Sequence, residues 1–561
     1  MRERLQAYRQ RDLRDDLVAA FIVAILLIPQ SLAYALLAGL PPQVGVYASV
    51  LPMAAYALLG SSSVNSVGPV AVVALLTAHG IAPVVAEGTP ATAAALVLAA
   101  EAGLLLAAAA LFRLDALAAL LSTPVLHGFS TGAALAISLS QLPALLGSPA
   151  RGFTAPEVIG SWWASGTAGH ALTAVFGLGA LALLWLARQH ARALLARWLA
   201  PATASLLARC SPLAVVAAGM ALAWALAADV RGVTLVGSLP AFALQFALPP
   251  LDVALWWRLL PSAAPLALVT FVSSLAVSEG LALRRREHID ARRELTGLAA
   301  ADLVAACSAG MPIGGSFSRG ALNAEAGART RAAGAWAALM MALAMLLLTA
   351  PLAWLPRAVL AASIVIAVMG VVEWRAFAEA WRYSRAEFAV MAAVGALTLF
   401  VGSEAALATG VALSIGLLLQ RSANPHVARI GRVGDTEHYR NVERHDVQGT
   451  PGVLALRIDE SLVFTNARRL ASVVAEQLAA APGTTRVVLL MSPVNAIDYS
   501  ALEALRALHE MLLERGIRLD LTEVKGPVLD RLRAGAWDKW FRGRVFLSHH
   551  HGMQDIEGHG P

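Results

Sequence analysis

Long apolar runs dominate the chain from residue 17 to about residue 421, and short polar or Arg-bearing connections separate them. Most of these runs are long enough to cross the roughly 30 Å hydrocarbon core of a bilayer as helices. We predict fourteen membrane segments, near residues 17–37, 40–59, 70–77, 93–112, 117–142, 171–186, 213–228, 265–283, 294–309, a short helix from 316, 335–350, 359–372, 388–401 and 405–419. With this count most connecting Arg residues share one side, so both termini are predicted to be cytoplasmic.

Two of the predicted segments are too short or too polar to span the bilayer alone. Val70–Thr77 covers only about 12 Å as a helix, and the stretch 311–320 mixes Pro, Gly, Ser and Arg. They are the third and the tenth segment, which are corresponding positions if the fourteen divide into two halves of seven. An inverted repeat with two broken helices that meet near the bilayer midplane predicts a transport site there.

Helix N-termini at mid-membrane depth would favour an anion as ligand. Each N-terminus offers free N–H groups and a partial positive charge of about +0.5. A helix beginning at Ser316 would supply one of them; the simpler alternative is a cytoplasmic loop with an ordinary N-cap serine. The first span is also interrupted, by Pro29-Gln30-Ser31, which is either a proline kink or a polar site inside the bundle.

Composition narrows the class of protein. Hydrophobic residues make up 58% of the 561 residues and charged residues only 14%, which is typical of a multi-pass membrane protein with the lipid bilayer as its partner. The net charge of +6 reflects cytoplasmic Arg residues and does not indicate nucleic-acid binding. The membrane part has no nucleophile–base pair, phosphate-binding Gly loop or metal-ligand cluster, so we expect no enzyme activity, no cofactor and no metal.

After residue 421 the pattern changes to that of a soluble α/β domain. Strands are predicted at 452–458, 486–491 and 518–522, with helices at 466–480 and 500–515 between them. We therefore divide the chain into a cytoplasmic N-terminal segment (1–16), a membrane domain (17–421), a linker (422–447), the α/β domain (448–548) and a polar tail (549–561). His549, His550 and His551 in that tail are expected to be solvated.

Four motifs resemble the sulfate permease (SulP) family of anion transporters: Pro29-Gln-Ser-Leu-Ala-Tyr34 with Gly39-Leu-Pro-Pro42, then Gly68-Pro69, Ile289-Asp-Ala-Arg-Arg-Glu-Leu295, and Gly315-Ser-Phe-Ser-Arg319. Ala496-Ile-Asp-Tyr-Ser-Ala-Leu502 is similar to the central loop of the STAS domain that such proteins carry. The resemblance implies two inverted repeats of seven segments, divided into a core and a gate domain. It also implies a homodimer and elevator-like alternating access.

By the same resemblance, the substrate binds between the N-termini of the third and tenth helices and beside the first helix. The matching positions in this sequence are Gln30, Tyr34, Val70, Ser316, Phe317, Ser318 and Arg319. Two helix N-termini and Arg319 together supply a charge of about +2, which would balance a divalent oxyanion or hold a monovalent one. The alternative role for Arg319 is a structural partner of a backbone carbonyl or of Glu325.

Two further positions bear on coupling and regulation. Many bacterial members of the family have a Glu on the eighth span where this chain has Ser273, so proton symport is in doubt and exchange or another coupling ion is favoured. Ser500 matches a serine that related anti-sigma-factor antagonists present for phosphorylation. It precedes a predicted helix, so it is either a regulatory phosphosite or a plain N-cap.

These features predict a secondary transporter for small oxyanions in the inner membrane. Sulfate is the first candidate, and bicarbonate, chloride or a dicarboxylate are the alternatives. A different class, a membrane-anchored regulator whose STAS domain recruits a cytoplasmic protein partner, also fits the domain order. The two broken helices argue against it, because a scaffold has no use for polar backbone at mid-membrane depth.

Overall fold

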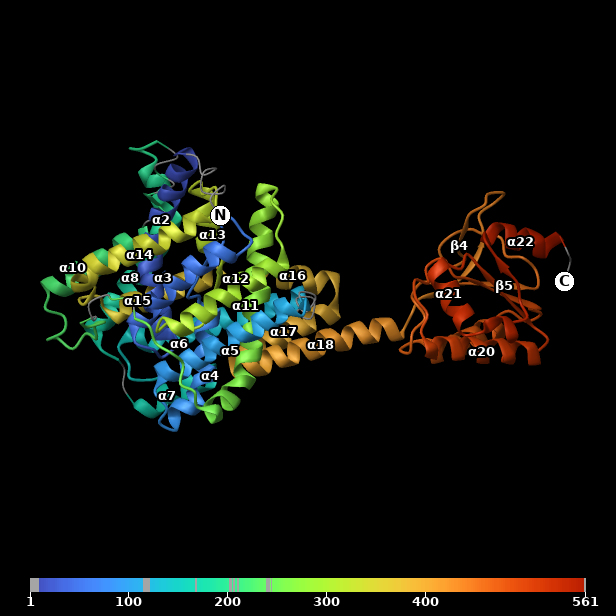
Figure 1. Ribbon diagram of the computed structural model, residues 1–561, viewed down its shortest axis with the longest axis horizontal. Coiled ribbons are helices and arrows are strands. Elements are labelled where there is room, and N and C mark those ends of the chain that lie inside the picture. The colour runs from blue at the N-terminus through green and yellow to red at the C-terminus, as the bar shows by residue number, and fades with distance from the viewer. Residues whose placement is uncertain are drawn as a thin grey trace. The chain divides into compact units, whose positions relative to one another are not determined.

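The protein divides into two compact units, Met1–Ser414 and Ile415–Pro561 (Figure 1). The computed structural model describes residues 10–114, 122–166, 169–200, 204, 207–208, 211–238, 243 and 245–558. Of the predicted N-terminal segment 1–16, residues 1–9 lie outside the described residues, and residues 10–16 already belong to the first helix, α2 (Gln10–Leu37).

The first unit is built almost entirely of helices. After α2 these are α3 (Pro42–Leu59), α4 (Ala71–Ala86), α5 (Ala91–Leu111), α6 (Thr123–Leu146), α7 (Ala155–Ser165), α8 (Ala171–Leu195), α10 (Ser211–Ala225), α11 (Val253–Arg285), α12 (Ala291–Cys307), α13 (Phe317–Glu325), α14 (Ala332–Leu352), α15 (Arg357–Met369), α16 (Trp374–Tyr383), α17 (Arg385–Phe400) and α18 (Ser403–Ala423), which runs on into the second unit. Within the described residues, eight helices are long and apolar enough to cross a membrane, and three apolar helices are shorter. The count of fourteen segments remains a prediction.

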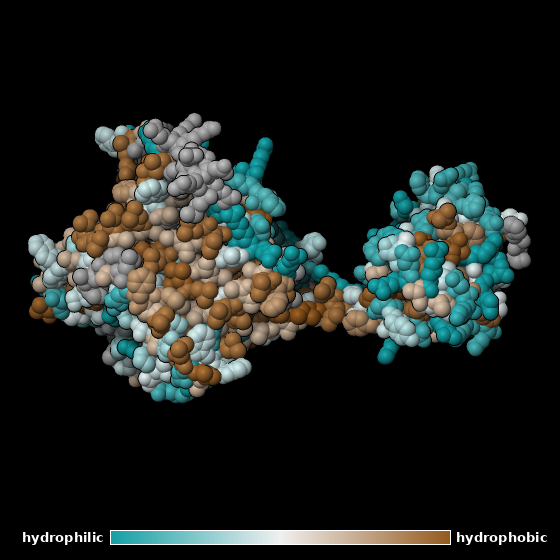
Figure 2. All heavy atoms as spheres, viewed as in Figure 1, coloured by the Kyte–Doolittle hydropathy of each residue, from teal (hydrophilic) through white to brown (hydrophobic). Residues whose placement is uncertain are grey.

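The face of this unit seen in Figure 2 carries wide apolar areas. Large side chains such as Leu58, Leu111 and Leu347 are exposed to between 70 and 78%. Large exposed apolar patches are rare on soluble monomers, whereas in a membrane lipid tails cover them. The surface therefore matches a protein that crosses the membrane several times.

Two predicted segments differ from the structure. α4 does not end at Thr77 but continues to Ala86, because polar His79 and Gly80 are tolerated inside the bundle. The span predicted from residue 265 begins earlier, because the 33-residue α11 starts at Val253 and runs through Pro261 and Pro265 without ending. In each case the helix continues past the residues that we expected to end or precede it.

Glycine lets some helices approach until their backbones touch. A Cβ at Gly45 of α3 would lie 1.9 Å from the Ser31 carbonyl oxygen of α2. A Cβ at Gly128 of α6 would lie 2.3 Å from the Met391 carbonyl oxygen of α17. Small residues at such crossings are the usual means of close packing between membrane helices.

The second unit contains a six-stranded sheet in the order β4-β3-β5-β6-β7-β8. Its strands are β3 (Val427–Arg432), β4 (Tyr439–Asn441), β5 (Val453–Ile458), β6 (Arg486–Leu490), β7 (Arg518–Thr522) and β8 (Val545–Phe546). The pairs from β5 to β8 are parallel, and β3 is antiparallel to β5 and to β4. The helices are α19 (Ala467–Ala479), α20 (Tyr499–Glu514), α21 (Gly526–Ala534) and α22 (His549–Gly558).

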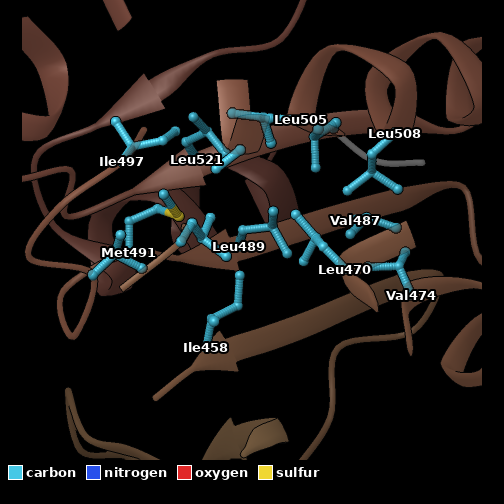
Figure 3. Close-up of a cluster of buried hydrophobic side chains, with 14 of the residues drawn as sticks. Ile458, Leu470, Val474, Val487, Leu489, Met491, Ile497, Leu505, Leu508 and Leu521 are labelled. Atoms are coloured by element: carbon cyan, nitrogen blue, oxygen red, sulfur yellow. The ribbon is translucent and has the colours of Figure 1, made fainter. Parts of the chain in front are cut away.

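The core of this unit lies between the sheet and helices α19 and α20. Val487 and Leu489 of β6 and Leu521 of β7 meet Leu470 and Leu505 from those helices (Figure 3). The three strands and two helices predicted from the sequence are the elements that build this core. Strands buried on both faces read as continuous apolar runs, which made them recognisable.

The predicted linker and polar tail are both part of the folded unit. Residues 422–447, predicted as a linker, contain β3 and β4, because Ala428 and Ile430 are buried against Ala455 and Leu490. Residues 549–561, predicted as a polar tail, form α22 up to Gly558, and its Met553 and Ile556 pack on Val488. Both stretches are too polar overall for their few buried side chains to stand out.

His549, predicted to be solvated, is buried. Its Nδ1 lies 2.8 Å from the Thr522 Oγ1, and its Nε2 has no hydrogen-bond partner among the described residues. Its ring packs edge-on against Tyr439 with the centroids 4.4 Å apart. Burial lowers the pKa of His549 from 6.5 to about 4.

This burial predicts an acid-sensitive C-terminal unit. Between pH 6.5 and about 4 the unfolded chain binds a proton that the folded unit excludes, so the free energy of unfolding falls as the pH falls through this window. His549→Gln should remove up to about 3 kcal/mol of that pH dependence. Pulse proteolysis in urea at pH 7 and pH 5 measures the free energy of unfolding, with His551→Gln, a change at an exposed histidine, as the control. An equal change in this free energy between the two pH values for the wild type and both variants would contradict the prediction.

Candidate functional site

Helix α13 begins where the sequence predicted. Ser316 has an extended backbone (φ −118°, ψ 115°), and its Oγ accepts a hydrogen bond from the Arg319 N–H at 3.4 Å. A serine in this conformation ends the preceding strand and caps the first turn of the helix. The Arg319 N–H is thus satisfied by the cap, whereas the other first N–H groups of a helix have no partner within it and can face a ligand.

Helix α4 begins in a similar way. The chain is extended through β1 (Ser66–Gly68) and Pro69, and Val70 is the N-cap residue with φ −135° and ψ 150°. Val70 has no capping side chain and makes no side-chain hydrogen bond to the helix. The first N–H groups of α4 are therefore left without a capping partner from this residue.

A two-stranded antiparallel sheet joins the starts of the two helices. Strand β1 pairs with β2 (Gly314–Ser316) in the register Ser66↔Ser316, Val67↔Gly315 and Gly68↔Gly314. Because each strand leads directly into its helix, α4 and α13 leave the strand pair in opposite directions with their N-termini beside it. This connects residues about 250 positions apart in the sequence.

The guanidinium of Arg319 lies beside this strand pair and is fully buried. Its Nη1 donates to the Pro69 carbonyl at 3.0 Å and to the Gln30 Oε1 at 3.2 Å. Its Nη2 is 3.5 Å from the position that a Cβ at Gly68 would occupy. Tyr34, one turn after Gln30 on α2, is buried and close enough for an electrostatic interaction with the guanidinium.

Arg319 has no negatively charged partner in the part of the chain that the structure describes. No carboxylate there lies within 4.0 Å of it, and neither its Nε nor its Nη2 has a hydrogen-bond partner. A buried charge is costly unless it is paired. The structure thus brings one uncompensated positive charge and two helix N-termini to the same place, which suits an anion.

The structure brings together most of the predicted site residues. Gln30 and Tyr34 on α2, Val70 before α4, and Ser316 and Arg319 at α13 surround the strand pair. Phe317 and Ser318 form the first turn of α13, but their side chains lie outside the described residues. Of the two alternative partners considered for Arg319, the backbone carbonyl is present, as that of Pro69.

Sequence reasoning missed Ser274. Its Oγ accepts a hydrogen bond from the Gly315 N–H at 2.8 Å, so α11 supports β2 directly. The neighbouring Ser273, where related proteins have a Glu, donates to the Thr270 carbonyl of its own helix, at 3.5 Å. Neither serine has a signal in the sequence that distinguishes it from the other.

Buried carboxylates occur on the helices next to α11. Glu101 on α5 and Glu294 and Asp302 on α12 are exposed by 3% or less. The Asp302 Oδ1 accepts a hydrogen bond from the Ile313 N–H at 2.9 Å, just before β2. A bundle without an acid at Ser273 therefore still holds titratable groups, and weak proton coupling stays a prediction.

Helices long and apolar enough to cross a membrane, with large apolar side chains on their outer surface, are the features of a multi-pass membrane protein. Within this bundle two helix N-termini and a buried guanidinium lie beside one strand pair. The sequence model of the sulfate permease family matches residues 13–394, and that of the STAS domain matches residues 444–552. The chain belongs to the sulfate permease family, whose members are anion transporters and not enzymes.

Similar proteins agree with this assignment. A "Probable sulfate transporter" of Mycobacterium tuberculosis (strain CDC 1551 / Oshkosh) is 34% identical over 551 residues, covering 96% of this chain and 95% of the relative. "Sulfate transporter 4.1, chloroplastic" of Arabidopsis thaliana is 31% identical, covering 94% of this chain and 78% of the relative. The inward-facing structure of the murine Solute Carrier 26 family member A9 anion transporter has the same fold, with a TM-score of 0.86 at 22% identity, covering 99% of this chain and 93% of that chain.

Proposed function

We propose that this protein is a secondary active transporter that carries small oxyanions, sulfate first, across the inner membrane. The anion binds between the N-termini of α4 and α13 and pairs with Arg319. A core domain that holds this site moves against a gate domain in an elevator-like cycle. Both termini lie in the cytoplasm, and the protein acts as a homodimer.

The observation that carries the proposal is that Arg319 is buried without enough partners for its guanidinium. Its guanidinium is fully buried, lacks a carboxylate partner among the described residues, and has two nitrogens without hydrogen bonds. A purely structural arginine would have its donors satisfied. An anion beside the strand pair would satisfy both nitrogens and offset the buried charge.

A tetrahedral dianion suits the chemistry of the surrounding groups. Sulfate is an acceptor only, and the site offers donors: the free nitrogens of Arg319, the Ser316 and Tyr34 hydroxyls, and helix N–H groups. The Gln30 amide, whose Oε1 is already bound to Arg319, can present its NH₂ group to the same ligand. The full charge of Arg319 and the partial charges of the two helix N-termini sum to about +2, which balances a dianion better than it balances chloride.

The C-terminal unit is proposed to be regulatory and to recruit a cytoplasmic protein partner. Ser500 is exposed in the first turn of α20, so it is accessible to modification. It is not the N-cap, because Asp498 holds that position and its carboxylate accepts from the Ala501 N–H at 2.9 Å. A phosphate on Ser500 would gain from the helix dipole but be opposed by Asp498.

Uptake by purified protein in liposomes tests the proposed function. We expect flux of sulfate, with bicarbonate, chloride, fumarate and oxalate as competitors to rank the alternatives. Strong preference for another anion of this panel would reassign the substrate. Absence of flux for every anion would contradict the proposal and favour the membrane-anchored regulator.

A further inference from the structure

The motif at residues 289–295 has no part in the proposed anion site, yet one of its residues is the centre of a buried polar network. Glu294, in the first turn of α12, has no exposed surface. Its Oε1 accepts hydrogen bonds from the Tyr56 hydroxyl at 2.6 Å, the Ser278 hydroxyl at 2.7 Å and the Asn65 Nδ2 at 3.4 Å. Its Oε2 accepts from the Ser61 N–H at 3.1 Å.

The donors to Glu294 come from three separate parts of the fold. Tyr56 lies on α3, Ser278 on α11, and Ser61 and Asn65 on the turn between α3 and β1. The backbones are also in contact here, because a Cβ at Gly297 would lie 2.5 Å from the Gly60 Cα. No cation lies within 4.0 Å of the carboxylate among the described residues, so hydrogen bonds alone hold it.

Asn65 links this network to the anion site. Its Nδ2 is bound to Ser278 as well as to Glu294, at 3.0 and 3.4 Å. A Cβ at Gly315 of β2 would lie 2.8 Å from the same nitrogen, so the amide packs against that strand. The next residue in the chain is Ser66, the first of β1. The carboxylate of Glu294 is thus one side chain away from both strands.

The turn 61–65, which contains Asn65, also contacts α13. The Val64 carbonyl accepts a hydrogen bond from the Asn323 Nδ2 at 3.0 Å. The Ser62 Oγ accepts from the Val64 and Asn65 N–H groups and so sets the shape of the turn. The turn 61–65 therefore determines where β1, the Pro69 carbonyl and the start of α4 lie relative to Arg319.

We propose that Glu294 is a positioning residue for anion binding, which orders the turn 61–65 and thereby holds the two helix N-termini at the distance that an oxyanion needs. The inference rests on the proposed function. Glu294 does not touch the anion; it acts through Asn65 and β1.

The chemistry of the network requires a carboxylate. Four donors converge on its two oxygens, and an ionised carboxylate accepts at both without offering a proton. A glutamine of the same shape would turn an NH₂ group toward donors and leave at least one of them unpaired. Glu294→Gln therefore changes the hydrogen bonding while it conserves the volume.

The test compares Glu294→Gln with Glu101→Gln in the full-length protein. Glu101 is a matched control, since it is a buried acid of the same unit and no hydrogen bond links it to either strand in the described part of the chain. Binding of radiolabelled sulfate to purified protein, and sulfate KM and Vmax in liposomes, are the readouts. We expect Glu294→Gln to weaken binding roughly tenfold and raise KM, and Glu101→Gln to bind like the wild type.

The outcomes separate the inference from the function on which it rests. Wild-type protein that binds and transports no anion would contradict the proposed function itself. If the wild type binds sulfate and Glu294→Gln binds it with the same affinity, the positioning role alone is overturned, even if the variant is less thermostable. If Glu294→Gln does not fold, Tyr56→Phe combined with Ser278→Ala removes two of the donors, and unchanged affinity in that variant would overturn the inference equally.

Discussion

Replacement of Arg319 by Ala is expected to abolish sulfate binding at concentrations that saturate the wild type. Among the residues that the structure describes, the guanidinium is the full positive charge beside the strand pair, and two of its nitrogens are free for a ligand. Loss of two hydrogen bonds between charged groups corresponds to at least about a hundredfold in affinity. Sulfate binding to detergent-purified protein measures it directly.

Two further variants make the Arg319 prediction specific. Arg319→Lys keeps the charge but loses the planar fork, so we expect weak binding that is intermediate between wild type and Arg319→Ala. Arg258→Ala removes an arginine that is 44% exposed and paired with Glu87, and should leave affinity unchanged. Wild-type affinity in a folded Arg319→Ala protein would show that the anion binds elsewhere.

Gly45→Ala is expected to disrupt the protein more than its small size suggests. The added methyl group would lie 1.9 Å from the Ser31 carbonyl oxygen, so α2 and α3 must move apart. Ser31 is next to Gln30, and the same movement would displace Gln30 and Tyr34 from Arg319. We expect a loss of stability of about 3 kcal/mol or more, together with loss of anion binding.

Gly280→Ala on α11 provides the matched control. A Cβ there has no heavy atom within 4 Å, and alanine favours a helix by about 1 kcal/mol over glycine. We expect Gly280→Ala to be as thermostable as the wild type or slightly more so in detergent. Equal thermal stability of Gly45→Ala and Gly280→Ala would contradict the close helix crossing.

Local signals in the sequence were sufficient for the parts of the site that depend on one stretch of chain. Ser316 predicted the start of α13, because a capping serine after two glycines acts through its own turn. Gly68 and Pro69 indicated a break before α4 for a similar reason. The grouping of Gln30, Tyr34 and Arg319 came from the resemblance to the family and not from the pattern itself.

Contacts between distant segments could not be predicted in this way. The pairing of Ser66 with Ser316 depends on the packing of the whole bundle, and each three-residue strand is too short to show a pattern of its own. The role of Ser274 depends on which face of α11 meets β2. Likewise β3 and β4 lie in a polar stretch, where few side chains, among them Ala428 and Ile430, face the core.

The link between α4 and α13 is made by main-chain pairing, and this affects how specificity can change over evolution. A bond between peptide groups does not depend on the identity of the side chains that flank it. Residues at positions such as Val70 or Ser316 can therefore be exchanged while the pairing that joins the two helices is kept. In the proposed elevator-like cycle, the moving part would stay the same while the side chains that it presents to the anion change.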